Sequence, residues 1–149
     1  MYDQHVLEWM HKRVHGATMQ YLHPAYRDGS NCTVRGIATA LGLHLITAYE
    51  LMKSQGRKHG RGTMPSVTRK AYKFIAKRYG YRFVALNYLD ARADYGKTIT
   101  TAQRVLGEHE RVVFSVRGHV IGFSKRKTDD WADSRRHHIL GAYTFKQAA

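Results

Sequence analysis

The apolar residues of the first half of the chain recur at the spacing of amphipathic helices. The first run predicts a helix from Asp3 to about His15, which Gly16 ends. The run NCTVRGIATALG predicts a second helix, with Asn31 as its cap and Gly42 at its end. A third helix is expected from about Leu45 to Ser54.

A glycine-rich basic stretch, GRKHGRGTMP, follows the third helix and predicts a loop. The fourth helix is expected to start at Ser66 or Thr63 and to continue to Gly80, because its apolar residues keep the helical period. Four helices are therefore expected up to Gly80.

Beyond Gly80 the pattern changes to runs of aromatic and branched residues, which are typical of strands. The first such run extends from Tyr81 to Leu89. A short helix, from about Thr101 to Leu106, precedes two further strands, RVVFSVRG and HVIGFS. A turn at Lys125–Lys127 leads to another expected strand at Thr128–Asp133, and HHILGAYTF predicts the last one.

Helices thus collect in the first half of the chain and strands in the second. This segregation predicts an α+β fold in which N-terminal helices pack on a C-terminal antiparallel sheet, because alternation would indicate a parallel one. No internal repeat, low-complexity segment or linker divides the chain, so residues 1–149 are expected to form a single domain.

The composition excludes several classes of protein. The chain has 149 residues, 43% of them hydrophobic, which permits a packed core and argues against a disordered basic tail. A single cysteine excludes an intramolecular disulfide scaffold and a multi-cysteine zinc module. No apolar run approaches the length of a membrane span, and charges at Asp3, Glu8, Lys12 and Arg13 are unlike a signal peptide. We therefore expect a cytoplasmic protein that has no membrane association and no cofactor.

The one cysteine, Cys32, is expected in the first turn of the second helix, directly after Asn31. A helix N-terminus offers unpaired N–H groups and about half a positive charge, which favour a thiolate and stabilise an oxyanion formed on an attacked carbonyl. These are the requirements of a nucleophilic cysteine. The alternative is a small buried residue without chemistry, since free cysteines are often buried.

The best candidate for a base is His119, which opens the expected strand HVIGFS after Gly118. The alternative is a surface or core histidine, since the chain contains ten. A third group that orients the imidazole is expected on the next strand. If the turn between these strands has two residues, alternation places Asp130 on the face of His119; if it has three, Asp129 takes that place.

The order of these residues resembles that of the papain-like cysteine peptidase superfamily: a cysteine opens a helix, a histidine opens a strand, and an aspartate lies on the next strand. Over roughly Asn31 to Tyr143, the motifs NCTVRGIATALG, GRKHGRGT and GHVIGFSKRKTDDW together look like those of a group of small uncharacterised phage and plasmid proteins. The resemblance implies a papain-like fold, with Cys32 as nucleophile, His119 as base and one of the two aspartates as orienting acid.

The chain departs from the papain-like pattern at the oxyanion hole. Enzymes of that superfamily usually place a glutamine several residues before the cysteine, and here only Gln4 and Gln20 precede Cys32. The side chains of Asn31 and Tyr26 are the candidate substitutes. A catalytically inactive relative is therefore the alternative to an enzyme.

Positive charge is concentrated in one part of the chain. The formal net charge is +14, and no Asp or Glu occurs between Leu51 and Leu89. Such a surface attracts polyanions, including nucleic acids and acidic proteins, and the GRKHGRGT stretch also offers backbone N–H groups to a phosphate. The alternative is a solvated cationic face. The candidate polyanion-binding residues are Arg57, Lys58, Arg61, Arg69, Lys70, Lys73 and Lys77.

The leading hypothesis is a small papain-like cysteine hydrolase of peptide, isopeptide or related acyl bonds, phage-encoded and active on a protein or peptide substrate in the host cytoplasm. The runner-up is a basic module that binds nucleic acid or an acidic host protein on a catalytically inactive peptidase-like fold. No metal site is expected: the motif His-Glu-x-x-His does not occur, and His11 and His15 are interpreted as a helix surface pair.

Overall fold

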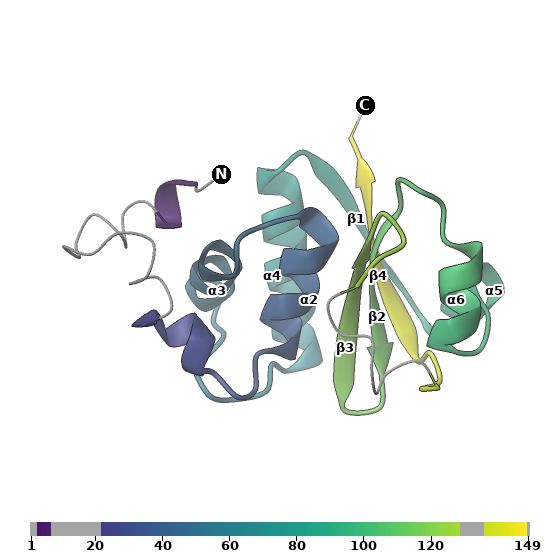
Figure 1. The fold of residues 1–149 in the computed structure, drawn as a ribbon, viewed down its shortest axis with the longest axis horizontal. Coiled ribbons are helices and arrows are strands. Elements are labelled where there is room, and N and C mark those ends of the chain that lie inside the picture. Colours follow the sequence, from purple (N-terminus) through teal and green to yellow (C-terminus); the bar gives the residue numbers. More distant parts are fainter. Residues whose placement is uncertain (1–2, 7–21, 129–135, 149) are drawn as a thin grey trace.

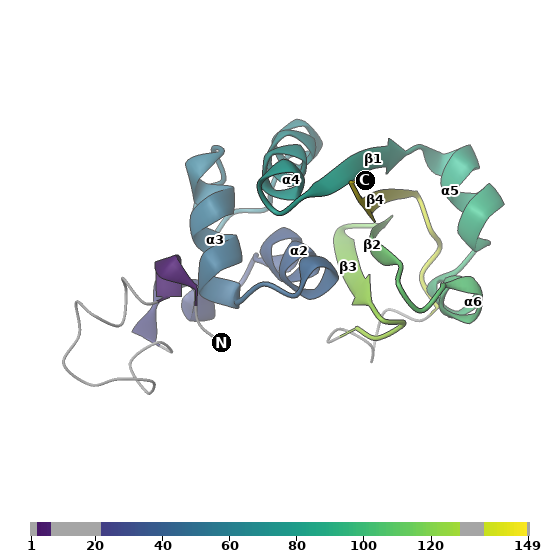
Figure 2. The ribbon, with the colours of Figure 1, turned by 90° about the horizontal axis from the view of Figure 1, so that it is seen from above.

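A four-stranded antiparallel sheet separates two groups of helices (Figure 1 and Figure 2). The computed structural model describes residues 3–6, 22–128 and 136–148. A short 3-10 helix, η2 (Pro24–Arg27), comes first in the central range. On one side of the sheet lie α2 (Cys32–Leu41), α3 (Leu45–Ser54) and α4 (Pro65–Arg78), and on the other lie α5 (Tyr88–Tyr95) and α6 (Ile99–Val105).

The sheet consists of β1 (Tyr81–Leu86), β2 (Arg111–Val116), β3 (His119–Ser124) and β4 (Gly141–Gln147), in the spatial order β1-β4-β2-β3. The last strand is inserted between β1 and β2, so that Phe145 pairs with Phe83 on one side and with Arg111 on the other. Among the described residues, β3 is therefore an edge strand.

Each face of the sheet carries its own apolar core. On one face, Val113 packs with Ile37 of α2 and Tyr72 of α4, and all three are fully buried. On the other face, Phe114 and Ile121 pack with residues of α5 and α6. A sheet that is covered on both faces needs apolar residues at successive positions, which explains the run RVVFSV in β2.

The predicted helices of the first half are confirmed from α2 to α4. Asn31 is the N-cap of α2, and Gly42 ends it in the left-handed conformation with φ of 68°. Helix α3 has the predicted bounds. Helix α4 begins at Pro65, between the two predicted starts, because a proline fits the first turn, where its missing N–H costs nothing.

The second half confirms the α+β class and corrects several bounds. The strand predicted to extend to Leu89 ends at Leu86, because the Asn87 side chain accepts a hydrogen bond from the N–H of Asp90 and starts α5. Helix α6 begins at Ile99 rather than Thr101, since Thr98 and Thr101 cap it reciprocally. The strand predicted for HHILGAYTF begins only at Gly141.

Two predicted elements lie largely outside the described residues. Residues 4–6 are helical, as the first predicted helix requires, and the remainder of that helix, 7–15, is outside the description. Of the strand predicted at Thr128–Asp133, only Thr128 is among the described residues, and Thr128 is not in a strand. No helix in the described part of the chain is long and apolar enough to cross a membrane.

Candidate active site

Helix α2 and strand β3 meet without any side chain between them at one point. A Cβ atom on Gly122 would lie only 2.1 Å from the carbonyl oxygen of Gly36, far inside any normal contact distance. A Cβ atom added to Gly36 would in turn lie 3.4 Å from a methyl carbon of Val120, two residues earlier on the same face of β3. This backbone contact fixes the start of β3 relative to the first turn of α2.

The first turn of α2 and the start of β3 border one cavity of about 490 Å³, which both the predicted nucleophile, Cys32, and the predicted base, His119, line. Cys32 and His119 lie far apart in the chain, and each is the first residue of its element. The cavity is lined by Gly29, Ser30, Asn31, Cys32, Arg35, Gly36, Gly62, Gly118, His119, Val120 and Gly122.

Cys32 is partly exposed and lies at the N-terminus of α2. The first intrahelical hydrogen bond joins the N–H of Arg35 to the carbonyl of Asn31, so the N–H groups of residues 32–34 precede the helical ladder. The Asn31 side chain makes no cap bond to this turn; its amide donates to the carbonyl of Ala25 at 3.3 Å. The end of the helix dipole therefore faces the cavity.

A buried tyrosine of α4, Tyr72, is hydrogen-bonded to this first turn. The Tyr72 hydroxyl donates a hydrogen bond of 2.6 Å to the carbonyl of Thr33, the residue after Cys32. Burial, together with the neighbouring Cys32 and Tyr143, raises the pKa of Tyr72 well above its ordinary value. Tyr72 is therefore a neutral donor that holds the cysteine-bearing turn in place.

His119 occupies the open end of the edge strand. It pairs with Val116 across a turn in which Gly118 has φ of 70°. Alternation turns Val120 and Gly122 toward α2, and places His119 with Ile121 on the other side of β3. His119 nevertheless lines the cavity, because it lies at the open edge of the sheet, where the described residues include no further strand beside β3.

The two candidate orienting acids, Asp129 and Asp130, both lie outside the described residues. The turn that leads toward them is described. Ser124 and Lys127 exchange two backbone hydrogen bonds, and Lys125 and Arg126 between them both have positive φ. A two-residue turn is the case for which alternation favours Asp130.

The structure separates the two candidates for the oxyanion hole. Asn31 lines the cavity. Tyr26 does not; its ring lies on η2, edge-on against His44 at 6.5 Å between centroids. Tyr26 is therefore not among the residues that border the cavity, because its ring on η2 lies toward the start of α3.

The GRKHGRGT stretch is a loop, as predicted, but Arg57 in it is not available to a polyanion. Its guanidinium lies 2.7 Å from the Asp28 carboxylate, and both side chains are almost fully buried. It also donates to the carbonyl of Ser30 at 3.0 Å. The expectation for Arg57 is thus corrected: the residue joins the loop to the segment before Cys32. The Thr33 and Thr63 hydroxyls, 2.7 Å apart, add a second link.

The charge of Asp28 is stabilised within this junction. Burial alone would raise the pKa of Asp28, but hydrogen bonds from the Ser30 N–H, Arg57 and the Gly60 N–H, with the charge of Arg57, outweigh it and lower the pKa below 3.8.

The six other predicted polyanion-binding residues have exposed side chains: Lys58, Arg61, Arg69, Lys70, Lys73 and Lys77.

A polar cluster next to this junction was not foreseen from the sequence. The buried His23 ring bonds Glu50 at 2.8 Å, and the Tyr49 hydroxyl bonds His59 at 3.0 Å. The His59 ring also lies 3.5 Å from the Asp28 carboxylate. These residues come from three separate segments, and nothing in their spacing predicts that they meet.

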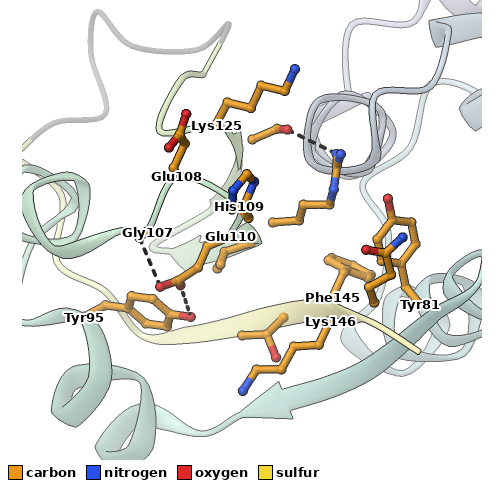
Figure 3. Close-up of a pocket in the computed structure, with 14 residues that line it drawn as sticks. Tyr81, Tyr95, Gly107, Glu108, His109, Glu110, Lys125, Phe145 and Lys146 are labelled. Atoms are coloured by element: carbon orange, nitrogen blue, oxygen red, sulfur yellow. Dashed lines mark hydrogen bonds between the residues drawn. The ribbon is translucent and has the colours of Figure 1, made fainter. Parts of the chain in front are cut away.

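A second cavity, of about 530 Å³, lies at the opposite end of the sheet (Figure 3). Some of its polar groups are bonded to one another: Glu110 accepts hydrogen bonds from the Tyr95 hydroxyl and the Gly107 N–H. Arg111 donates to the carbonyl of Ala40 and to Ser124. These contacts join α5, α2 and the sheet, and they give this cavity a structural explanation.

The described residues contain no group of three or more His, Cys, Asp or Glu side chains placed to hold a metal ion. No protein-family model, curated protein or solved structure matches this chain.

Proposed function

We propose that this protein is a small cysteine hydrolase of acyl bonds, built on a papain-like arrangement of helix and sheet. One observation carries the proposal: Cys32 and His119, each at the start of its element, border the same cavity. A nucleophile at a helix N-terminus with a histidine at the same cavity is the arrangement that thiol acyl transfer requires.

In this proposal Cys32 attacks the carbonyl of a peptide or isopeptide bond. The Sγ–C bond forms, the C–N bond breaks, and the amine leaves with a proton that His119 took from the thiol. The N–H groups of the first turn of α2, with the Asn31 amide, stabilise the oxyanion. Water then attacks the thioester, releasing the carboxylic acid and returning the thiol. Asp130 or Asp129 orients the imidazole, and a phage-encoded enzyme would act on a host protein in the cytoplasm.

The test is the acyl-enzyme intermediate. Incubation with a panel of p-nitrophenyl esters and peptide thioesters should add the mass of one acyl group to Cys32, detected by intact-protein mass spectrometry. Cys32→Ser should abolish the adduct. His119→Ala should slow its formation by about 100-fold, since a positioned base contributes at least that factor. His109→Ala, an exposed histidine that lines the other cavity, is the matched control. Absence of any adduct on the native protein counts against a hydrolase.

A second function is favoured by the exposed face of α4. Lys70, Lys73 and Lys77 are exposed along this helix, and Phe74, one helical turn from both Lys70 and Lys77, is 40% exposed. Like charges so closely spaced repel one another, and an exposed aromatic ring among cations is the arrangement on which a nucleic-acid base stacks. We propose that this face binds single-stranded nucleic acid, independently of Cys32.

This second proposal is tested by electrophoretic shift on single-stranded DNA and RNA across a salt series. A plot of log affinity against log salt concentration has a negative slope. In the triple variant Lys70→Gln, Lys73→Gln, Lys77→Gln this slope should be less steep by roughly 2 to 3. The matched control removes the exposed Lys97, Lys125 and Lys146, which lie elsewhere. Equal slopes for the two triple variants, or no binding near physiological salt, would contradict binding at α4.

A further inference from the structure

Strand β1 forms the edge of the sheet opposite β3, and one row of its backbone groups points away from the sheet (Figure 2). Just before β1 begins, the Ala148 N–H donates to the carbonyl of Gly80 at 2.9 Å. Such bonds recur at every second residue of an antiparallel pair, so the alternate residues of β1, from Arg82 to Leu86, bond to β4. The residues whose N–H and carbonyl groups point away from β4 are Tyr81, Phe83 and Ala85.

These outward backbone groups form an accessible strand edge. No backbone hydrogen bond reaches them from elsewhere in the described part of the chain. Val84 is 47% exposed, and Ala85 beside it is exposed as well. A strand edge of this kind can pair with another extended segment, because main-chain groups supply the hydrogen bonds. The edge of β1 is therefore a surface on which a further strand can be added.

On the α5 side of this edge the exposed side chains are apolar. Val84 lies on that face of β1 together with Leu86, which packs against the core of α5 and α6. At the end of the strand, Tyr88 and Leu89 of α5 are 45% and 72% exposed, and Leu140 is 45% exposed. Tyr88, Leu86 and Leu140 line a cavity of about 410 Å³. Apolar side chains of an added strand would be buried on this side.

On the α4 side of the edge the exposed side chains are cationic. Arg69 lines the same cavity as Ala85, and Lys73 follows one helical turn later on the same side of α4. Neither cation takes part in an ion pair among the described residues. The exposed acids Asp90 and Asp94 belong to α5, which lies on the other face of the sheet (Figure 2). Acidic side chains of an added strand would be attracted to the α4 side.

We propose that the edge of β1 binds an extended segment of a partner protein in which acidic and apolar residues alternate. Successive side chains of a strand point to opposite faces, so such a segment presents its acids to Arg69 and its apolar residues to Val84 and Tyr88. A second copy of this chain fits the edge less well. Antiparallel pairing of two β1 strands would bring together the α4 cations of two molecules that each carry a net charge of +14.

Hydrogen exchange followed by NMR on the native protein tests the added strand. The probe is a soluble peptide of alternating glutamate and valine. In the free protein the Val84 N–H, which bonds to β4, should exchange slowly, and the N–H groups of Phe83 and Ala85 should exchange faster. Saturation with the peptide should slow exchange at Phe83 and Ala85 by about tenfold or more. Full protection of these two groups in the free protein, or no slowing with the peptide, overturns the proposal.

Two control peptides separate the pattern from the charge, with affinity measured by fluorescence anisotropy. The first has the same composition but places all glutamates before all valines. The second alternates lysine and valine. The alternating acidic peptide should bind most tightly, since it alone supplies acids on one face and apolar side chains on the other. Equal affinity of the block peptide overturns strand addition, and equal affinity of the lysine peptide overturns selection by the α4 cations.

Variants of the edge test the same contacts. Ala85→Pro removes an outward N–H without breaking a bond to β4, and it should weaken binding by about tenfold or more. Ala85→Ser keeps the N–H and is the matched control. Circular dichroism verifies that Ala85→Pro is folded, and hydrogen exchange on the native protein decides if it is not. Unchanged binding by a folded Ala85→Pro protein contradicts the proposal.

Arg69→Gln should weaken binding of the acidic peptide by about twofold to fivefold, which is the size expected for one exposed ion pair. Lys125→Gln removes an exposed lysine from the turn after β3, at the opposite edge of the sheet, and should have no effect. Equal effects of the two substitutions would mean that the net charge, and not Arg69, attracts the peptide.

Sedimentation of the native protein over a range of concentrations tests the other occupant of this edge. A monomer at all concentrations is the expected result. A dimer that Ala85→Pro dissociates would assign the edge to a second copy of the chain and overturn the peptide proposal. None of these measurements depends on the thiol or on turnover, so strand addition and the proposed hydrolase activity can fail separately.

Discussion

The buried pair of Asp28 and Arg57 is the residue-scale feature that holds the site together. Asp28 precedes the segment that leads to Cys32, and Arg57 anchors the loop that ends at the Thr63–Thr33 contact. Two charges buried in such a pair stabilise the fold less than their distance suggests, but either one alone is costly. The pair therefore determines where the loop lies.

Asp28→Asn should lower the free energy of unfolding by about 3 to 5 kcal/mol, because it leaves the Arg57 guanidinium buried without a counter-ion. Urea denaturation followed by circular dichroism measures this loss. Glu108→Gln, at an exposed position, is the control and should change stability by less than about 0.5 kcal/mol. Similar small losses for the two variants would show that the loop is not anchored by this pair.

The same pair predicts an acid-dependent loss of stability. The pKa of Asp28 is lowered in the folded state, so its ionised form contributes stability that is complete above the unfolded value of 3.8. This contribution is lost as the pH falls through the lower, folded pKa. The difference in unfolding free energy between the native protein and Asp28→Asn should be constant above about pH 5 and shrink toward pH 2. A difference that stays constant, or grows, in acid would contradict the assignment.

At this scale the sequence predicts some site residues and not others. Cys32 and His119 are recognisable because each follows a local signal, a cap for α2 and a glycine before β3. Arg57 is not, because nothing local distinguishes a buried arginine from its exposed neighbours Lys58 and Arg61. Its partner, Asp28, comes from a distant segment.

At the scale of elements, the contact between α2 and β3 sets the geometry of the site. Gly122→Ala should lower the free energy of unfolding by about 1 to 3 kcal/mol, because the added Cβ would lie 2.1 Å from the Gly36 carbonyl oxygen and push the helix from the strand. Gly29→Ala is the control, since an added Cβ there meets nothing within 4 Å. Both are measured by urea denaturation.

Gly122→Ala should also change the geometry of the cavity that Cys32 and His119 border. Because α2 carries Cys32 and β3 carries His119, Gly122→Ala should move one relative to the other. Loss of acyl-enzyme formation in a folded Gly122→Ala protein would support this. Stability and acylation equal to those of the native protein would mean that the backbones do not approach as closely as described.

The helices α2 to α4 were predictable because their apolar faces and terminal residues agree. Helix α5 was not, because YLDARADY has no single apolar face and buries only Ala91 and Tyr95. The late start of β4 has another cause. The residues before β4 make backbone contacts with the segment before α6 instead of with the sheet. The Ile139 N–H donates to the carbonyl of Lys97, and His138 forms an isolated β-bridge with Thr98.

At the scale of the whole molecule, the order β1-β4-β2-β3 brings the start of β3 to the same end as the start of α2. Hydrophobic pattern predicts the class of fold, but strand order depends on pairings between distant segments, which leave no local signal. The placement of α5 and α6 on the second face of the sheet is not predicted for the same reason. The positive charge is also unevenly distributed over the structure. The charge of Arg57 is buried and paired with Asp28, whereas other cations are exposed on α4 and beside the Cys32 cavity.

In the proposed function His119 activates Cys32, and this activation is measured by the alkylation rate of the thiol with iodoacetamide near pH 7. The native protein should react about tenfold or more faster than N-acetylcysteine amide. His119→Ala should return the rate to about that of the free thiol, and His109→Ala should not change it. A native rate no higher than that of the free thiol, unaltered by His119→Ala, would contradict the proposed nucleophile and base.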